Sequence, residues 1–532
     1  MVKTWGKLGQ VTLIARIARS PGALAALAFV FVLWRIGIPS FWRDESVSVM
    51  AATMSFDELW KLLDKIDAVH ALYYLLLRPF AAFDGELAAR LPSALAVAGA
   101  TFGIVAIGRR VATPQVGMFA GLVYAVLPMV SRYGQEARSY ALVSAVAVAA
   151  TWVLLGERRS RYLGYGLLIA LLGWFHLYAL LLVPAHAVTI LLRKRSEIVP
   201  WLASMVGAGV LLVPLALIAS GQRDEQLFWL KVPGLADLGT FGVELAGGPK
   251  AWDATSLPML FLGLLLVLAL LGTWWALRAG ARSRTSAGTG AGTPPGTGPR
   301  AGADAVPGRS PSAGVDALPG AGPRTGVEVL PERGPSAGAS GPAGTGPGGA
   351  LLASVTLPWL ILPVALSFAI SQVYPIYNAR YVFFVIPALA LLAGAGLAAA
   401  RRTPVGLAVF TALAVLSASA HLAIREPDAR PDDLRTLAAV LSAEQRPGDA
   451  VLYVPVKYRL FVAVYGEPYG KLVEPGARST RVWLVSPRLR GTTWEDDPRL
   501  KELKKEFRGG RTRAFGAVRL TLYTRSRISS NA

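Results

Sequence analysis

GALAALAFVFVLWRIGIPSFWRDESVSVM, residues 22–50, joins a long apolar run directly to an arginine and two carboxylic acids. The apolar part, from about residue 22 to 38, has the length of a helix that crosses the ~30 Å hydrocarbon core of a bilayer. Charged side chains at the mouth of such a span are costly, so they usually have a function. Arg43, Asp44 and Glu45 are therefore the first candidates for a functional site.

Similar apolar runs recur along the chain of 532 residues, of which 53% are hydrophobic and 16% charged. We therefore expect a multi-pass membrane protein. The net charge of +21 could suggest nucleic acid, but Arg and Lys gather between the apolar runs and in the C-terminal segment, as membrane topology requires, so no nucleic-acid partner is expected. The absence of cysteine excludes disulfides, iron–sulfur clusters and thiolate zinc sites.

The positions of the basic residues predict the orientation, because short cytoplasmic loops are enriched in Lys and Arg. This rule places the N-terminus, the pair Arg109 and Arg110, GERRSR at 156–161 and RKR at 193–195 in the cytoplasm. The C-terminus then lies outside the plasma membrane. About eleven transmembrane helices are predicted, at 22–38, 86–110, 115–130, 139–155, two short helices that turn near GWFHLY (173–178), 198–219, 256–278, 350–371, 381–400 and 404–422.

Composition divides the chain into four parts. Residues 1–278 form an N-terminal transmembrane module with outer loops, and residues 350–422 the C-terminal transmembrane helices. Between them, residues 279–349 are rich in Gly, Pro and Ala, which predicts a disordered cytoplasmic linker. Residues 423–532 predict a small extracytoplasmic α/β domain, with one helix in PDDLRTLAAVLSAE and strands in AVLYVPV, RVWLVS and AVRLTLYT. This domain is either a lid over an outer site or a folded tail that adds stability.

The predicted topology brings four polar segments to the outer face: WRDES, YGQEARSY, FHLY and SQVYPIYNARY. A carboxylate in such a group could be a general base, and an Arg with Tyr hydroxyls could hold a phosphate or pyrophosphate. The first segment also has a plainer interpretation, in which Arg43 and Asp44 form a structural ion pair.

The other three segments also allow structural interpretations. Glu136 and Arg138 could form an interfacial salt bridge, and His176 could be a hydrogen-bonded residue of an aromatic belt. Arg380 could anchor its span at the interface. Because the positive-inside rule does not call for arginine on the outer side, a contact with a lipid phosphate is favoured for Arg380.

Five motifs follow one another along the chain: WRDES, FDELWKLLDKIDAVHALYYLLLRPF, GELAARLPSAL, SRYGQEARSYAL and NARYVFFVIPALALLAG. Together they resemble the membrane glycosyltransferases of the GT-C fold, of the protein O-mannosyltransferase and aminoarabinose transferase type. The resemblance covers roughly residues 20–420, excluding the linker. The chain departs from these relatives in having AVHALYY where they often carry a His-Pro-Pro run, and in its long low-complexity insert. Both departures bear on the substrate more than on the fold.

The resemblance implies an all-α polytopic GT-C enzyme that moves a sugar from a polyprenyl-phosphate donor to an acceptor hydroxyl of a protein, lipid or glycan. Mannose is favoured as the sugar because the bias toward Ala, Gly, Pro and Arg, with few Lys, suggests a high-GC bacterial gene. The resemblance also implies transfer at the outer face of the membrane. The mechanism that we expect there is inverting, with Asp44 as general base and Glu45 as the alternative base. Arg380 and Arg138 would offset charge on the departing phosphate. The residues assigned to substrate binding are Arg43, His70, Tyr73, Arg90, Tyr133, Glu136, Arg138, His176, Arg380 and Tyr381.

No cofactor or metal is assigned. A divalent cation beside Asp44, Glu45 and Glu136 stays open, but carboxylates on separate loops have no recognisable ligand spacing. Two other functions also stay open: a lipid-linked glycan ligase or polymerase, and a multi-pass transporter or flippase. A transporter would favour inverted repeats and charges at mid-membrane, whereas the strongest charges here lie in predicted outer loops.

Overall fold

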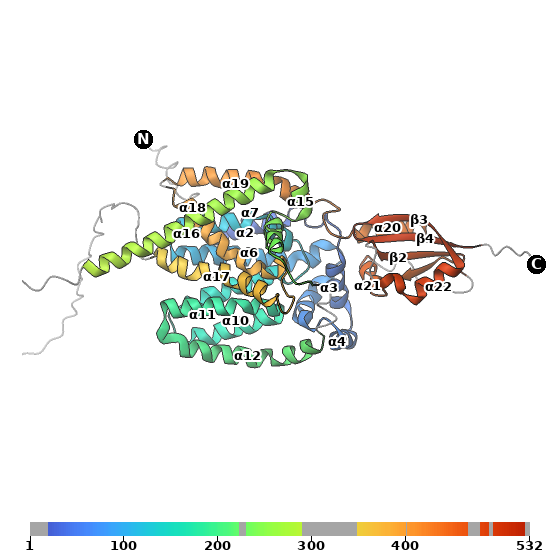
Figure 1. The fold of residues 1–532 in the computed structure, drawn as a ribbon, viewed down its shortest axis with the longest axis horizontal. Coiled ribbons are helices and arrows are strands. Elements are labelled where there is room, and N and C mark those ends of the chain that lie inside the picture. Colours follow the sequence, from blue (N-terminus) through green and yellow to red (C-terminus); the bar gives the residue numbers. More distant parts are fainter. Residues whose placement is uncertain are drawn as a thin grey trace, which may run out of the picture.

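The computed structural model describes residues 20–222, 230–289, 348–400, 402–465, 479–488 and 493–526. A helical bundle makes up most of the molecule, and a small α/β domain stands at one end of it (Figure 1). The predicted cytoplasmic N-terminus and most of the predicted linker lie outside the described residues.

The bundle is built from long apolar helices joined by short ones. The long elements and their 3₁₀ extensions are α2 (Pro21–Leu33), α5 (Ala71–Ala81), α6 (Glu86–Val111), α7 (Pro114–Val126), α8 (Pro128–Gly134), α9 (Tyr140–Leu154), α10 (Arg161–Phe175), η2 (Leu177–Leu181), α11 (Leu182–Arg193), α12 (Ile198–Gly221), α16 (Leu257–Thr289), α17 (Gly348–Ile370), η5 (Ala379–Val385), α18 (Ile386–Ala398) and α19 (Thr403–Ala423). The connections contain α3 (Arg43–Thr53), α4 (Phe56–Lys65), η1 (Ala68–His70), η3 (Arg195–Glu197), η4 (Leu235–Asp237), α14 (Leu238–Leu245) and α15 (Pro249–Ala254).

The apolar helices confirm a multi-pass membrane architecture. Six described segments are long and apolar enough to cross a bilayer: Glu86–Val111, Arg195–Gly221, Leu257–Ala279, Gly349–Ile370, Ala379–Ala398 and Thr403–Ala423. The pair α7 and α8 would be a seventh, and α2, α9, α10 and the segment Leu177–Arg193 are shorter apolar helices. Every predicted span thus overlaps an apolar helix, while the count of eleven crossings stays a prediction.

Two predicted boundaries differ from the structure. The span predicted at 115–130 is broken between α7 and α8, which meet at a bend of 64°. Pro128 begins α8, and a proline lacks the N–H that would continue the hydrogen bonds of α7. In addition, α16 continues to Thr289, well past residue 279, where the linker was predicted to begin. The turn near GWFHLY is confirmed, because α10 ends at Phe175 and η2 begins at Leu177.

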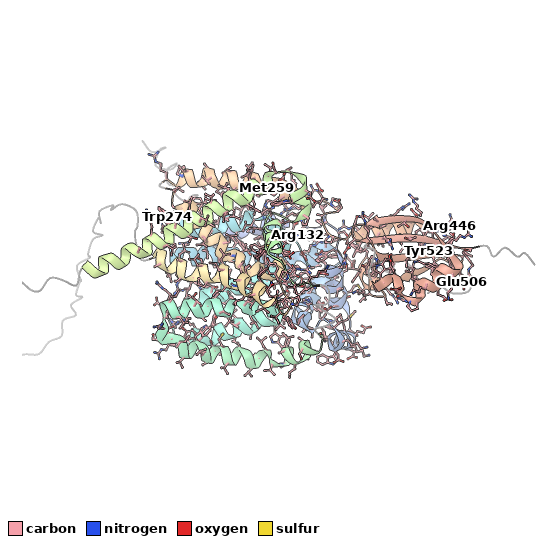
Figure 2. The ribbon with its side chains drawn as sticks, in the orientation of Figure 1. Arg132, Met259, Trp274, Arg446, Glu506 and Tyr523 are labelled. Carbon is pink, nitrogen blue, oxygen red and sulfur yellow. The ribbon has the colours of Figure 1, made fainter. Side chains whose placement is uncertain are left out.

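Close packing of small residues holds the centre of the bundle together. Helix α18 is buried from Ile386 to Leu397. A Cβ on Gly396 would come within 2.1 Å of the Leu268 carbonyl oxygen of α16, and one on Gly394 would meet the backbone of α7. Glycine therefore allows these three helices to approach closely. On its outer side α16 exposes Met259 and Trp274 (Figure 2), as a lipid-facing surface would.

The small domain contains α20 (Leu434–Glu444), β1 (Ala450–Tyr453), α21 (Tyr458–Ala463), β2 (Arg481–Pro487), η6 (Thr493–Asp496), α22 (Pro498–Glu506), β3 (Phe507–Phe515) and β4 (Val518–Arg525). The strands form one sheet in the order β1-β2-β4-β3, with β1 and β2 parallel and the other pairs antiparallel. Side chains alternate along β2, so Trp483 packs with α20 and α21 and Leu484 packs with α22. The predicted helix and all three predicted strands are present, and β3 was missed.

Candidate active site

The WRDES segment forms the first turn of α3, at the end of the bundle that faces the small domain (Figure 1). Asp44 and Glu45 lie in the first helical turn, where carboxylates interact favourably with the positive end of the helix dipole. Successive residues of a helix point about 100° apart. The two side chains therefore have different surroundings: the Asp44 side chain is 26% exposed, and that of Glu45 is completely buried.

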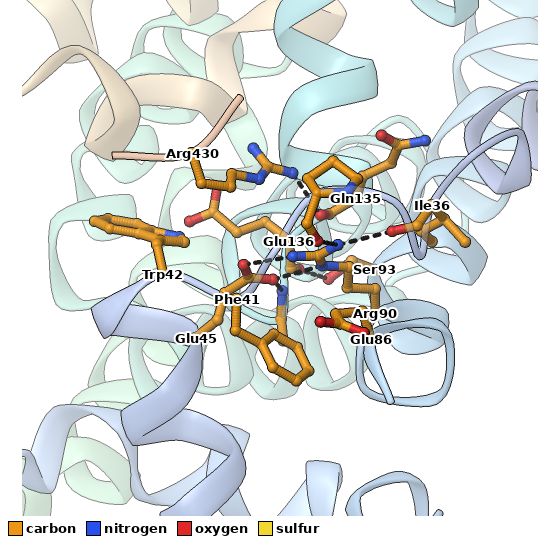
Figure 3. A network of polar contacts seen from close by, with 12 residues as sticks. Ile36, Phe41, Trp42, Glu45, Glu86, Arg90, Ser93, Gln135, Glu136 and Arg430 are labelled. Atoms are coloured by element: carbon orange, nitrogen blue, oxygen red, sulfur yellow. Dashed lines mark hydrogen bonds and ion pairs between the residues drawn. The ribbon is translucent and has the colours of Figure 1, made fainter. Parts of the chain in front are cut away.

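Glu45 is held by a buried network (Figure 3). Arg90 of α6 donates from Nε to Oε1 at 2.7 Å and from Nη2 to Oε2 at 2.8 Å, and the Ala137 amide donates to Oε1 at 2.8 Å. Burial alone would raise the pKa of Glu45, but the charge and hydrogen bonds of Arg90 outweigh it and lower that pKa. Glu45 thus ties α3 to α6 and to the loop after α8 as an ionised carboxylate.

Arg90 has no capacity left for a substrate. Besides Glu45, its Nη1 donates to the carbonyls of Ile36 at 2.7 Å and Pro39 at 2.8 Å, and its Nη2 to that of Ser40 at 3.2 Å. Its five N–H donors are all engaged, and its side chain is fully buried. The prediction that Arg90 binds substrate is therefore corrected: Arg90 shapes the loop between α2 and α3.

Arg43 points toward the small domain. Its Nε and Nη2 each lie 2.9 Å from an oxygen of Asp432, whose side chain is fully buried, and its backbone amide donates to the same carboxylate at 3.2 Å. The alternative in which Arg43 and Asp44 pair with each other is therefore wrong. Asp432 binds one edge of the Arg43 guanidinium, and the Arg43 side chain stays 33% exposed, so the predicted substrate contact of Arg43 stays a prediction.

Asp44 instead meets Arg380, which the η5 segment carries to the same place. Nη1 of Arg380 lies 3.3 Å from Oδ2 of Asp44. The guanidinium also lies 5.6 Å from the ring centroid of Trp42 and 5.4 Å from that of Tyr381. The backbone amide of Arg380 bonds to the side chain of Asn378, which fixes the start of η5. The partly exposed Asp44 carboxylate and the Arg380 guanidinium are therefore direct neighbours.

Arg138 and the neutral His70 form a second polar group close to α3. Arg138 donates from Nη1 to the Ser48 hydroxyl at 3.2 Å, and its Nη2 lies 3.0 Å from Nε2 of His70. Burial, followed by the charge of Arg138, holds the pKa of His70 well below its usual value. His70 is therefore neutral at physiological pH, and its Nε2 can accept from Arg138. The predicted salt bridge between Glu136 and Arg138 is replaced by these contacts.

Aromatic side chains line the next layer. The His176 ring lies 5.0 Å from the ring of Tyr381 and 6.0 Å from that of Tyr140, and Tyr178 stacks on Tyr381 at 5.4 Å. Burial, then the charges of Arg138 and Arg380, lower the pKa of His176 to about 3. Three segments far apart in the sequence thus supply one cluster of aromatic rings.

The remaining predicted residues are buried more deeply. Tyr133 donates its hydroxyl to Glu244 at 3.1 Å, and Tyr73 is 1% exposed in the core. Glu136 is 1% exposed, and its Oε1 has no hydrogen-bond partner among the described residues. Burial raises the pKa of Glu136, against the opposing charge of Arg430. Among the described side chains, no hydrogen bond links Tyr133, Tyr73 or Glu136 to the partly exposed region around Asp44.

The segment after α19 supplies residues that were not predicted. Arg430 donates to the Gln135 carbonyl at 2.7 Å, and Arg425 donates to the carbonyls of Phe31 and Trp34. Farther along, Tyr465 donates to Glu86 at 2.7 Å. The charged run IREPDARPDD directly after the last span was the available signal. It indicates polar contacts at the bundle end but not their partners.

No group of three or more His, Asp or Glu side chains within the described ranges could hold a metal ion. The expectation that the protein works without a cofactor stays a prediction.

No protein-family model matches the sequence, and no curated protein matches it. Solved structures with the same fold include ArnT from Cupriavidus metallidurans in the apo state, at 12% identity and a TM-score of 0.54, covering 97% of this chain and 98% of that chain. ArnT bound to undecaprenyl phosphate gives a TM-score of 0.53 with the same identity and coverage. The chain thus shares the fold of ArnT over nearly its whole length.

Proposed function

We propose that this chain, which has the fold of ArnT, is a membrane glycosyltransferase that moves a sugar from a polyprenyl-phosphate donor to an acceptor hydroxyl. The observation that carries the proposal is the meeting of Asp44 with Arg380, beside Arg138 and a cluster of aromatic rings. A base, cations for a phosphate and flat rings for a sugar are the groups that such a transfer needs. ArnT has been crystallised with undecaprenyl phosphate, a lipid of the proposed donor class.

Asp44 is the proposed general base. Its side chain is partly exposed, whereas Glu45 is buried with both oxygens bonded. A base must reach the proton that it removes, either directly or through one water. We therefore assign Glu45 a positioning role: through Arg90 and Ala137 it fixes the first turn of α3, on which Asp44 stands.

In the proposed step, Asp44 accepts the proton of the acceptor hydroxyl while the hydroxyl oxygen attacks the anomeric carbon of the donor. The bond from that carbon to the phosphate oxygen breaks, and its electron pair leaves with the polyprenyl phosphate. Attack from the face opposite the phosphate inverts the anomeric centre. The products are the glycosylated acceptor, a protonated Asp44 and the polyprenyl phosphate anion.

Arg380 and Arg138 are the proposed partners of the departing phosphate. A guanidinium has five N–H donors in a planar fork, so Arg380 can bind a phosphate without giving up Asp44. Ser48 and His70 fix the orientation of Arg138. Cations that are already in place when charge develops on a leaving group lower the barrier without reorganisation.

The aromatic cluster is proposed to hold the sugar. The rings of Tyr178 and Tyr381 are stacked with an interplanar angle of 29°, and Tyr140 lies at 29° to Tyr381. Flat aromatic faces can cover the apolar face of a pyranose, while the tyrosine hydroxyls offer hydrogen bonds to its substituents. We propose mannose as the sugar, on the ground that the bias toward Ala, Gly, Pro and Arg suggests a high-GC bacterial gene. The proposed acceptor is a protein, a lipid or a glycan at the outer face of the plasma membrane.

The test is a panel of radiolabelled donors offered to membranes that contain the chain or an empty vector. Transfer of label from polyprenyl-phosphate mannose into an acid-stable product would support the full proposal. Transfer only from another polyprenyl-monophosphate donor would support the proposed reaction but exclude mannose as the sugar. Transfer only from a polyprenyl-pyrophosphate glycan would indicate the lipid-linked glycan ligase. Movement of intact donor across the membrane with no new glycosidic bond would indicate a flippase.

A further inference from the structure

A cavity lies at the end of the bundle opposite Asp44. Its volume is about 310 Å³, and it is enclosed by the C-terminal ends of α6, α9 and α11 and the beginning of α17. Arg90, near the candidate active site, and Arg110, at the cavity, stand 20 residues apart on α6, which corresponds to roughly 30 Å along the helix. The cavity is therefore separate from the candidate active site.

Positive charge dominates the cavity. Arg110, Arg193 and Lys194 line it together with one carboxylate, Glu157. None of the three cations forms an ion pair with another described residue. The neighbouring Arg161 behaves differently, because it is paired with Glu197. The cavity thus has an excess of positive charge that the protein itself does not balance.

The cations are held in place by other contacts. The Arg110 guanidinium lies 5.1 Å from the ring centroid of Trp152, and the Lys194 ammonium donates to the Gly156 carbonyl at 2.8 Å. Burial, then the charge of nearby Arg161, lower the pKa of Lys194 against the opposing charge of Glu157, and Arg110 lowers it further. An anion in the cavity would stabilise all three cations.

The remaining walls are apolar and continue onto the lipid-facing surface. Val111, Leu154 and Ile190 line the interior, while Leu191 and Leu192 of α11 are 46% and 64% exposed beside it. An inorganic anion would gain nothing from these walls. A lipid would, because its headgroup can enter the cavity while its chains stay against α11. Basic pockets between transmembrane helices are typical sites for anionic headgroups.

We propose that this cavity binds the phosphate headgroup of an anionic phospholipid from the adjacent leaflet. The two arginines contact the phosphate oxygens with their planar forks, and Lys194 contributes a point charge. The apolar walls receive the glycerol backbone of the lipid. The site does not depend on the proposed sugar transfer.

The test is lipid retention by the purified full chain in detergent, measured by native mass spectrometry. The probes are phosphatidylglycerol, phosphatidylcholine and inorganic phosphate. The variant is Arg110→Gln with Arg193→Gln, and the matched control is Arg109→Gln with Arg195→Gln, which removes the same charge from exposed neighbours that do not line the cavity. Each phosphate-binding cation contributes ~1 kcal/mol near a membrane surface, which is about fivefold in affinity, so the double variant should weaken phosphatidylglycerol binding by roughly thirtyfold.

The expected result is preferential retention of phosphatidylglycerol by the native chain and by the control, and its loss in the double variant. Replacing both arginines by lysine should keep most of the binding. If the double variant does not fold, Arg193→Gln alone, at an exposed position, should weaken binding about fivefold. Equal retention of the two lipids, or equal binding by the variant, would overturn the proposal. Displacement of the lipid by millimolar inorganic phosphate would assign the cavity to a soluble anion instead.

Discussion

Nη1 of Arg380 lies 3.3 Å from Oδ2 of Asp44, although 336 positions of sequence separate the two residues. Asp44 stands in the first turn of α3, and Arg380 at the start of η5, just before the buried α18. The contact accounts for an arginine on the predicted outer side, where membrane topology does not call for one. It also places the proposed base and the proposed phosphate ligand within reach of one substrate.

Arg380→Ala should lower the rate of sugar transfer by on the order of 10²-fold to 10³-fold, as the loss of a preorganised charge at a developing anion does. Arg380→Lys should keep part of the activity, since it retains the charge but loses the planar fork. The measurement is the initial rate with a saturating polyprenyl-phosphate sugar. Arg278→Ala, a surface arginine near the far end of α16, is the control and should transfer normally. Full activity in Arg380→Ala would exclude a role at the phosphate.

Glu45→Gln should destabilise the protein far more than Asp44→Asn does. The first substitution leaves Arg90 charged and buried without its partner, which typically costs about 3–5 kcal/mol. The second breaks a partly exposed pair, for which about 0–1 kcal/mol is usual. Thermal unfolding of the purified variants in one detergent measures the difference. Equal unfolding temperatures would contradict the division of the acidic pair into a positioning residue and a base.

Asp432→Asn should lower the turnover number roughly tenfold and leave the donor KM nearly unchanged. The Asp432 carboxylate holds both the Arg43 side chain and its backbone amide, and thereby the turn that carries Asp44. A misplaced base slows chemistry without weakening donor binding, and small displacements of a reacting group are costly. Asp428→Asn removes an exposed partner of Lys250 and serves as the control. A change confined to KM would instead point to a direct donor contact.

Stability should fall in mild acid because of His176. Its pKa is about 3 in the folded protein, against ~6.5 for an unperturbed histidine, so the unfolded chain binds more protons in this interval. The contribution is therefore largest above about pH 6.5 and is lost progressively as the pH falls toward 3. His176→Gln should remove this part of the pH dependence of stability. Unfolding temperatures of both proteins from pH 7 to pH 4 should converge at the acid end, and parallel curves would contradict the assignment.

Much of the fold follows from the spacing of apolar residues. Every predicted span overlaps an apolar helix, and the turn at GWFHLY was found from the length between two basic loops. The bend at Pro128 was missed because prolines are tolerated inside many transmembrane helices. Strand β3, FRGGRTRAF, was missed for another reason: its two glycines and three arginines hide the alternation typical of a strand.

The candidate site was only partly predictable. The predicted groups that the structure brings near Asp44 are Arg138, His70, His176, Arg380 and Tyr381. Arg43 is instead paired with Asp432, far away in the chain, and Arg90 donates to backbone carbonyls. Nothing in a single sequence distinguishes an arginine that binds substrate from one that holds a loop, because the difference lies in tertiary contacts. For the same reason, Asp432 and Arg430 were not predicted to contribute to the site.

The most direct test compares purified native protein with Asp44→Asn in an assay with a defined polyprenyl-phosphate donor and endogenous acceptors. Asn keeps the size of the side chain but cannot accept the proton, so the rate should fall by at least ~10²-fold. Unfolding temperature should stay nearly the same. Asp44→Glu, which restores the carboxylate, should recover part of the rate. Equal transfer by the native protein and by folded Asp44→Asn would contradict the proposal that Asp44 is the base.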